Sequence, residues 1–181
     1  YQVVLNKGLS WLIKLQHYSL KGDPEKSMLL AQVKRLINEC NLFPARVRLT
    51  EISPDELIFS DDQEKKFIFM DLSEGYQAIL GLTIDIIRNL SEKFGPGQLF
   101  DTENPDIVIA PAIVLIDEVD AHLHPTWQQN IGPWLIKHFP NIQFIVTTHS
   151  PLICQAAHQG TVFRLPGTGL YLEQEIETDQ A

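Results

Sequence analysis

The segment Ile113-Val114-Leu115-Ile116-Asp117-Glu118 joins four aliphatic residues to two adjacent acids. The aliphatic run extends from Ala112 to Ile116, and such a run is typical of a strand that is buried on both faces of a parallel sheet. A second run, Ile142 to Val146, leads into Thr147-Thr148-His149-Ser150-Pro151, and a helical pattern from Pro125 to about His138 lies between the two runs. This strand–helix–strand order predicts a parallel α/β sheet, in which ligands bind at the carboxyl ends of the strands.

The rest of the chain is expected to add flanking helices and a smaller sheet. Apolar periodicity and capping residues mark the helices, and short apolar runs between turn residues mark the strands. We therefore divide the chain into a helical arm with a small sheet, residues 1–70, and an α/β part, residues 71–181. The predicted elements are helices over about 8–20, 24–40 and 73–94, strand-like runs at 47–52, 57–59 and 67–69, a loop over 95–111 and a closing hairpin from 161–165 and 170–173.

Composition excludes several classes of protein. The 181 residues are 44% hydrophobic and 20% charged, which is ordinary for a globular domain, and no apolar stretch approaches the roughly 20 residues that cross a bilayer. No export signal is visible and Cys40 and Cys154 lie far apart, so a cytoplasmic protein without a membrane partner is expected. Residues 1–50 carry a charge of +5 within a chain of net charge −9, which fits either a nucleic-acid contact or a solvated helical face.

Chemically useful side chains follow both aliphatic runs. Asp117 suits Mg²⁺, because a hard cation prefers oxygen ligands, and Glu118 is placed to orient and deprotonate a water molecule. An imidazole at the end of the neighbouring strand, His149, is suited to a hydrogen bond with a terminal phosphate. Taken one at a time, these residues also fit an exposed strand end and a structural histidine.

A third motif, Leu72-Ser73-Glu74-Gly75-Tyr76-Gln77, opens the long helix predicted from about residue 73. Ser73 is a good helix N-cap, and free backbone N–H groups at a helix start attract anions. The motif therefore predicts an anion site, although plain helix capping explains it equally well when it is considered alone.

In this order and spacing, the motifs resemble the C-terminal half of a soluble ABC-type ATPase head, in the branch of AAA/ABC-like proteins related to OLD-type, RecF-like and SMC-like heads. The segment 72–77 resembles the ABC signature, and Val114 to Glu118 resembles Walker B with its catalytic glutamate. Val119 to Pro125 resembles the D-loop, and Thr148 to Pro151 resembles the loop that carries the switch histidine. The resemblance covers residues 70–155.

This resemblance implies a partial P-loop NTPase fold, ATP and Mg²⁺ as cofactors, and ATP hydrolysis between two heads that close on nucleotide. Asp117 is then the metal ligand, and Glu118 and His149 are the catalytic residues. The residues implied to bind the nucleotide are Ser73, Glu74, Gly75, Gln77 and Asp120. The implied partners are a second copy or a complementary half, with a nuclease or DNA as a further partner in maintenance or defence.

One element of such a head is absent from the sequence. A phosphate-binding Gly-x-x-x-x-Gly-Lys-[Ser/Thr] loop does not occur, since Lys26 alone is followed by Ser or Thr and no glycine precedes it. We expect the chain to need a Walker A-bearing half and to be inactive by itself. Two other functions stay open: an inactive dimerisation module that keeps the fold, and a zinc hydrolase built on His122 and His124.

Overall fold

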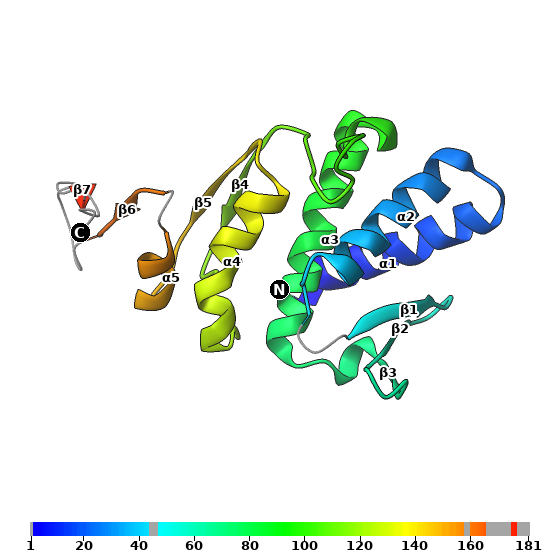
Figure 1. Ribbon diagram of the computed structural model, residues 1–181, viewed down its shortest axis with the longest axis horizontal. Helices are drawn as coiled ribbons and strands as arrows, with labels where there is room; N and C mark the ends of the chain where they lie inside the picture. Colours follow the sequence, from blue (N-terminus) through cyan, green and yellow to red (C-terminus); the bar gives the residue numbers. More distant parts are fainter. Residues whose placement is uncertain (1, 44–46, 158–159, 166–174, 177–181) are drawn as a thin grey trace.

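The structure is a computed structural model that describes residues 2–43, 47–157, 160–165 and 175–176. A helical arm stands at one end of the molecule, and a parallel strand pair with its own helices stands at the other (Figure 1). In the structure the arm comprises α1 (Gln2–Leu20) and α2 (Pro24–Glu39) together with α3 (Glu74–Phe94), which lies beyond the predicted boundary at residue 70. The prediction of an α/β fold with flanking helices and an N-terminal helical arm is confirmed.

The three helices of the arm pack their apolar faces together. The N-cap of α2 is Asp23, whose side chain accepts a hydrogen bond from Lys26 N at 3.0 Å. Gly8 of α1 lies so close to α3 that a Cβ there would be 3.3 Å from Ile84 Cγ2. The first helix begins at Gln2, earlier than predicted, and it packs on α3 across the boundary drawn at residue 70. That boundary stays a prediction.

A small antiparallel sheet with the order β1-β2-β3 adjoins the arm. Its strands are β1 (Arg48–Ile52), β2 (Leu57–Ser60) and β3 (Lys66–Ile68), followed by a 3-10 turn, η1 (Phe69–Asp71). The free edge of β1 is closed by Asn38, which donates to Leu49 O at 3.0 Å and accepts from Leu49 N at 2.8 Å. Because an unpaired edge invites further strands, this side chain protects the sheet as well as attaching it to α2.

The second half is built on β4 (Ala112–Ile116) and β5 (Ile142–Val146), which pair in parallel as predicted. The crossover helix is α4 (Pro125–His138). A helix that the sequence did not predict, α5 (Pro151–Ala156), follows β5, with Ser150 as its N-cap.

The remaining segments differ in part from the predictions. The predicted loop 95–111 contains a 3-10 turn, η2 (Pro96–Gln98), and a bridge between Phe100 and Val108. In the closing hairpin, β6 (Val162–Phe163) pairs with β7 (Glu175–Ile176), beyond the predicted partner 170–173, which lies outside the described residues. Among the described helices, none is long and apolar enough to span a membrane.

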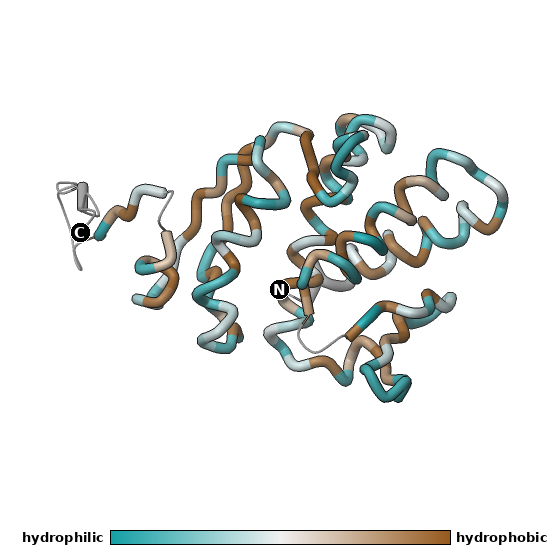
Figure 2. The backbone as a smooth tube through the Cα atoms, viewed as in Figure 1, coloured by the Kyte–Doolittle hydropathy of each residue, from teal (hydrophilic) through white to brown (hydrophobic). Residues whose placement is uncertain are grey.

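The prediction that β4 is buried on both faces is wrong. Ile113 is 64% exposed and Leu115 76% exposed, and Ile145 of β5 is 51% exposed. The alternate residues Val114 and Phe144 pack against the core, which includes residues of α4. One face of the strand pair is therefore covered and the other is an apolar surface open to solvent. Figure 2 shows that both strands are rich in hydrophobic residues, coloured brown. The aliphatic composition fits two buried faces, but the described chain covers only one.

Candidate functional site at the ends of β4 and β5

The candidate site begins where the two parallel strands end. Ile116 pairs with Val146, so Asp117 and Thr147 leave the sheet side by side. Backbone hydrogen bonds continue beyond the strands, from Thr147 N to Ile116 O and from Val119 N to Thr147 O, both at 3.0 Å. The two segments that carry the predicted acids and imidazole are thus held together at one edge.

Thr147 connects the two acids to β5, a role that the sequence did not predict. Its hydroxyl donates to Asp117 Oδ1 and accepts from Glu118 N, the latter at 2.8 Å. This fixes one oxygen of Asp117 and turns the backbone of Glu118. One feature of the sequence could have indicated this role: Thr147 is a hydroxyl residue directly after the second aliphatic run, just as Asp117 directly follows the first.

Glu118 adopts a left-handed backbone conformation with φ of 50°. Such a conformation is uncommon for a residue with a side chain and persists where surrounding contacts hold it, here the bond from its N–H to Thr147. Its carboxylate is exposed and forms no hydrogen bond or ion pair with another described residue. The side chain is therefore available to a water molecule or a ligand.

Asp120 fixes the loop that carries His149. Asp120 Oδ1 accepts from the Thr148 hydroxyl and, at 3.2 Å, from His149 N. Partial burial acts to raise the pKa of Asp120, but the bonds from Thr148 and the backbone outweigh it, so the pKa is lowered. The carboxylate of Asp120 thus holds the loop of His149 in place, and its predicted contact with nucleotide stays a prediction.

The far side of this loop is tied to α4. The buried Ser150 hydroxyl donates to Gln128 Oε1 at 2.7 Å, and Gln128 Nε2 donates to Leu123 O at 2.9 Å. One side chain of α4 therefore joins the D-loop-like segment to the loop of His149. Between these anchors the imidazole of His149 is exposed, and it forms no hydrogen bond within the part of the chain that the structure describes.

The signature-like segment lies against the D-loop-like segment. Glu74 Oε2 is 2.8 Å from His122 Nδ1. A Cβ added to Gly75 would be 2.7 Å from His122 O, a distance that side-chain carbons do not tolerate. Gly75 is thus required for the close approach of α3 to this loop, independently of any anion.

The other two residues of the signature-like segment behave differently. Ser73 is the N-cap of α3 as predicted, but its side chain makes no capping hydrogen bond, which leaves the hydroxyl open to a ligand. Gln77 turns back on the chain, where its Nε2 donates to Leu72 O at 2.8 Å and to Met70 O at 3.3 Å. The structure thus brings Glu74 and Gly75 to His122, while Asp117, Glu118, Asp120 and His149 gather at the strand ends.

The donor set at the strand ends fits a hard divalent cation. Asp117 is exposed, and only one of its two carboxylate oxygens accepts from Thr147, so the other oxygen forms no hydrogen bond with a described residue and is available to a cation. The histidines of the zinc alternative do not converge. His122 faces Glu74, His124 Nδ1 accepts from Thr126 N, and the described residues contain no group of three or more His, Cys, Asp or Glu side chains that could hold a metal ion.

Comparison with known proteins gives consistent matches. A family model described as "AAA domain, putative AbiEii toxin, Type IV TA system" matches residues 19–155. The chain is 42% identical over 113 residues to the Retron Ec83 probable ATPase of Escherichia coli and 39% identical over 118 residues to the Septu protein PtuA of Bacillus mycoides. It is 36% identical over 146 residues to the Retron Vc95 probable ATPase of Vibrio cholerae.

These alignments cover 62%, 60% and 78% of this chain but 19%, 15% and 26% of the relatives, so the chain spans a minor part of their length. A solved SMC ATPase superposes with a TM-score of 0.49 at 19% identity, over 76% of this chain and 79% of that chain. The SMC head domain from Thermotoga maritima gives a TM-score of 0.45 at 22% identity, over 71% of this chain and 40% of that one.

Proposed function

Since the chain belongs to the family described as "AAA domain, putative AbiEii toxin, Type IV TA system", we propose that it is the signature-bearing, C-terminal portion of an ATP-binding and hydrolysing head. The resemblance to a soluble ABC-type ATPase head is confirmed at the level of the family. The observation that carries the proposal is the parallel pairing of β4 with β5, which places Asp117 and Glu118 beside the loop of His149.

Each residue at the strand ends has a role that its environment supports. Glu118, with an unengaged carboxylate, orients the attacking water and accepts its proton. His149, exposed between two anchored residues, donates a hydrogen bond to the terminal phosphate. Asp120 and Thr147 position these groups without needing to contact the nucleotide themselves.

Asp117 and the Thr147 hydroxyl are the residues that would hold Mg²⁺ next to the phosphates. The bound cation supplies positive charge that offsets the negative charge of the transferred phosphoryl group. Because phosphoryl transfer depends mainly on positioning and charge stabilisation, the fixed hydrogen bonds around Asp117 and Asp120 matter as much as the reactive side chains.

A complementary Walker A-bearing half is part of the proposal. The open apolar face of β4 and β5 supports it, because Ile113, Leu115 and Ile145 form a surface that soluble proteins normally cover. The signature-like and D-loop-like segments lie side by side through Gly75 and His122, which supports their acting together on nucleotide held by a second head. Ser73 and Gly75 would close that site, with Glu74 and Gln77 holding the helix start in position.

The output of such a head is mechanical: ATP closes a dimer and hydrolysis opens it. The names of the relatives, two retron ATPases and a Septu protein, support a role in bacterial defence. A nuclease or a nucleic acid is accordingly the proposed partner of the whole protein.

The decisive experiment measures Mg·ATP binding and turnover by this chain mixed with a Walker A-bearing half, or by a full-length protein that contains it. Glu118→Gln should keep ATP binding and lower turnover by at least about a hundredfold, since general-base catalysis contributes 10²–10⁴-fold. Glu103→Gln, which removes an exposed carboxylate from the loop before β4, is the matched control and should leave turnover unchanged. Normal turnover in Glu118→Gln would show that Glu118 is not the residue that accepts the proton of the attacking water.

An inactive interaction module is the second candidate, and the open apolar face of β4 favours it. It predicts association with the complementary half but no Mg·ATP binding by the complex. The measurement of Mg·ATP binding by the mixture therefore distinguishes the two functions.

A further inference from the structure

The loop that carries His149 is held at two points, one on each side of the histidine. On one side, the Thr148 hydroxyl donates to Asp120 Oδ1, and His149 N donates to the same oxygen at 3.2 Å. On the other side, the Ser150 hydroxyl donates to Gln128 Oε1 at 2.7 Å. The second contact depends on a residue of α4 that has no part in the proposed chemistry, so its purpose needs an explanation.

Gln128 uses both ends of its side-chain amide. While its Oε1 accepts from Ser150, its Nε2 donates to Leu123 O at 2.9 Å. Leu123 N in turn donates to Asp120 O at 3.0 Å, and Ser150 N donates to Thr148 Oγ1 at 3.0 Å. With the bond from Thr148 to Asp120, these contacts form a closed ring of hydrogen bonds. The ring joins the D-loop-like segment, α4 and the loop after β5.

The hydroxyl of Ser150 depends on Gln128 for its acceptor. Ser150 is 7% exposed, and its Oγ also accepts from Leu152 N at 3.2 Å as the N-cap of α5. A buried hydroxyl that loses its acceptor must turn away or reach water, because leaving it without a partner is unfavourable. Removal of the Gln128 amide should therefore release one side of the loop from α4.

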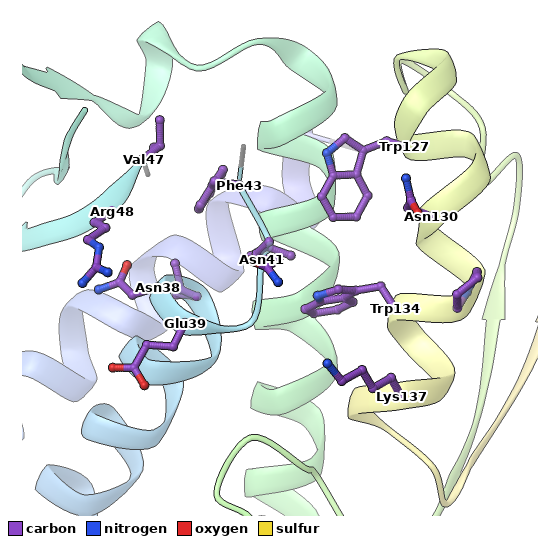
Figure 3. Close-up of a pocket in the computed structure, with 13 residues that line it drawn as sticks. Asn38, Glu39, Asn41, Phe43, Val47, Arg48, Trp127, Asn130, Trp134 and Lys137 are labelled. Carbon is purple, nitrogen blue, oxygen red and sulfur yellow. The ribbon is translucent and has the colours of Figure 1, made fainter. Parts of the chain in front are cut away.

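The helix that carries Gln128 is itself fixed to the arm. Trp134 of α4 is 7% exposed, and its Nε1 donates at 2.7 Å to the carbonyl oxygen of Cys40, the C-cap of α2. Figure 3 shows the rings of Trp127 and Trp134 projecting from α4 toward the end of α2 and the residues that follow it. Gln128 therefore holds the loop from a helix that is attached to the core of the arm.

We propose that Gln128 is a positioning residue for His149: it holds the loop so that the imidazole reaches the terminal phosphate. This role rests on the proposed function, which assigns the phosphate contact to His149. Gln128 acts through Ser150 and needs no contact of its own with the nucleotide. The effect on the reaction can be large, because a displacement of about 1 Å near the reacting atoms can lower a rate about a hundredfold.

The first measurement uses the 181-residue chain without nucleotide. Gln128→Met keeps the length of the side chain and removes both hydrogen bonds, and Gln129→Met makes the same change at the next residue of α4, which is exposed, as the matched control. Nuclear magnetic relaxation of the His149 amide gives its order parameter, about 0.85 for a rigid backbone and below about 0.6 for a flexible one. This value should fall toward the flexible range in Gln128→Met and stay at the parent value in Gln129→Met.

A second variant keeps the proposal testable if Gln128→Met does not fold. Ser150→Ala removes the other partner of the same hydrogen bond and should cause a similar fall in the order parameter of His149. The double variant should be little worse than either single variant, because both substitutions remove the same contact. A rigid His149 in both single variants would overturn the proposal.

The second measurement is the turnover of Mg·ATP by this chain mixed with a Walker A-bearing half. Gln128→Met should lower kcat by about ten- to a hundredfold, while Gln129→Met leaves it unchanged. In a His149→Ala background, the same Gln128 substitution should change kcat by less than about twofold, because the group that it positions is no longer present. An equal loss in both backgrounds would indicate a general structural effect and would overturn the proposal.

The two measurements distinguish this role from the proposed function. If the parent mixture does not hydrolyse ATP but His149 loses order in Gln128→Met, the proposed function is contradicted and the hold of Gln128 on the loop is supported. If the parent mixture hydrolyses ATP and Gln128→Met changes neither order nor turnover, the positioning role alone is contradicted.

Discussion

The helical arm buries its apolar residues, whereas the β4–β5 pair leaves the apolar residues of one face exposed. In the arm, Leu12 of α1, Leu36 of α2 and Leu80 of α3 are all fully buried against one another's helices. In the strand pair, Leu115 and Ile145 point to solvent although their composition is that of a core. The arm is complete within the chain, whereas the strand pair, which carries the candidate catalytic residues, is complete on one face only.

The residues that stabilise the chain and the candidate catalytic residues therefore lie in different parts of the molecule. Burying a Leu side chain contributes about 1.5–3 kcal/mol, so the arm and the covered face of the sheet supply the stability of the chain. The strand ends supply the reactive groups, which are held by a hydrogen bond from the Thr147 hydroxyl and by one to the Asp120 carboxylate rather than by a surrounding core. The following substitutions test whether the two regions are as unequal as their burial indicates.

The largest effect is expected in the arm. Leu80→Ala removes a side chain with no exposed surface and should lower the free energy of unfolding by about 2–5 kcal/mol, because the helices around it cannot close the cavity fully. Chemical denaturation followed by circular dichroism measures the change. A loss below about 1 kcal/mol would show that the arm is loosely packed and would remove the contrast with the strand pair.

A smaller effect is expected at the contact between the arm and the D-loop-like segment. Gly75→Ala places a methyl group 2.7 Å from His122 O, so the start of α3 must move away. This should lower the free energy of unfolding by about 1–3 kcal/mol. Gly132→Ala is the matched control: nothing lies within 4 Å of its added Cβ, and alanine in a helix should be neutral or stabilising. Equal unfolding free energies for the two variants would contradict the close approach of Gly75 to His122.

A smaller effect again is expected from pH at the junction of α4 with the loop before β4. Burial lowers the pKa of His138 below its ordinary 6.5, and Nδ1 donates to Asp106 O at 2.8 Å. His138 Nε2 is buried with no hydrogen-bond partner among the described residues, so a second proton there has no acceptor.

The unfolded chain therefore binds a proton near pH 6.5 that the folded chain resists, and the stability contributed by His138 is lost as pH falls below 6.5 toward the folded pKa. Unfolding free energies of the parent chain should fall across this window, and His138→Gln should reduce the slope. His17→Gln, which alters an exposed histidine of α1, should leave the slope unchanged. Identical slopes in all three proteins would remove His138 from this role.

Local pattern was sufficient for the strands and helices whose own residues determine them. β4, α4 and β5 have the predicted bounds, because aliphatic runs and the turn residues around them mark both ends. The short helix α5 was not predicted, since six residues carry little periodicity and Ser150 had been interpreted only as part of the loop of His149.

The candidate site was predictable in its residues but not in its contacts. Adjacent acids and an imidazole after parallel strands must meet at one edge, and the structure places them there. The roles of Thr147, Gln128 and the Glu74–His122 pair depend on side-chain positions that no spacing in the sequence specifies. Burial of β4 was misjudged for a related reason: residue type indicates that a strand is suited to burial, whereas what covers it depends on the elements packed against it.

The smallest effect is expected on the open face of β4, and it bears most directly on function. Leu115→Lys replaces a side chain that is 76% exposed, so the unfolding free energy of this chain should change by no more than about 0.5 kcal/mol. Val114→Lys, one residue earlier and partly buried against the core, is the matched control and should be clearly more destabilising, because it places a charge in an apolar contact without a partner.

If a Walker A-bearing half covers the open face, Leu115→Lys should also abolish its association with this chain, because the introduced ammonium group would then be buried in that contact without a partner. Pull-down of the complementary half measures this directly, with denaturation of the chain alone as the reference. Unchanged association would mean that the apolar face of β4 is not where the second half binds. A strong loss of stability in the chain alone would mean that Leu115 is already covered within this chain. The arm and the β4–β5 pair would then not differ in how fully they bury their apolar residues.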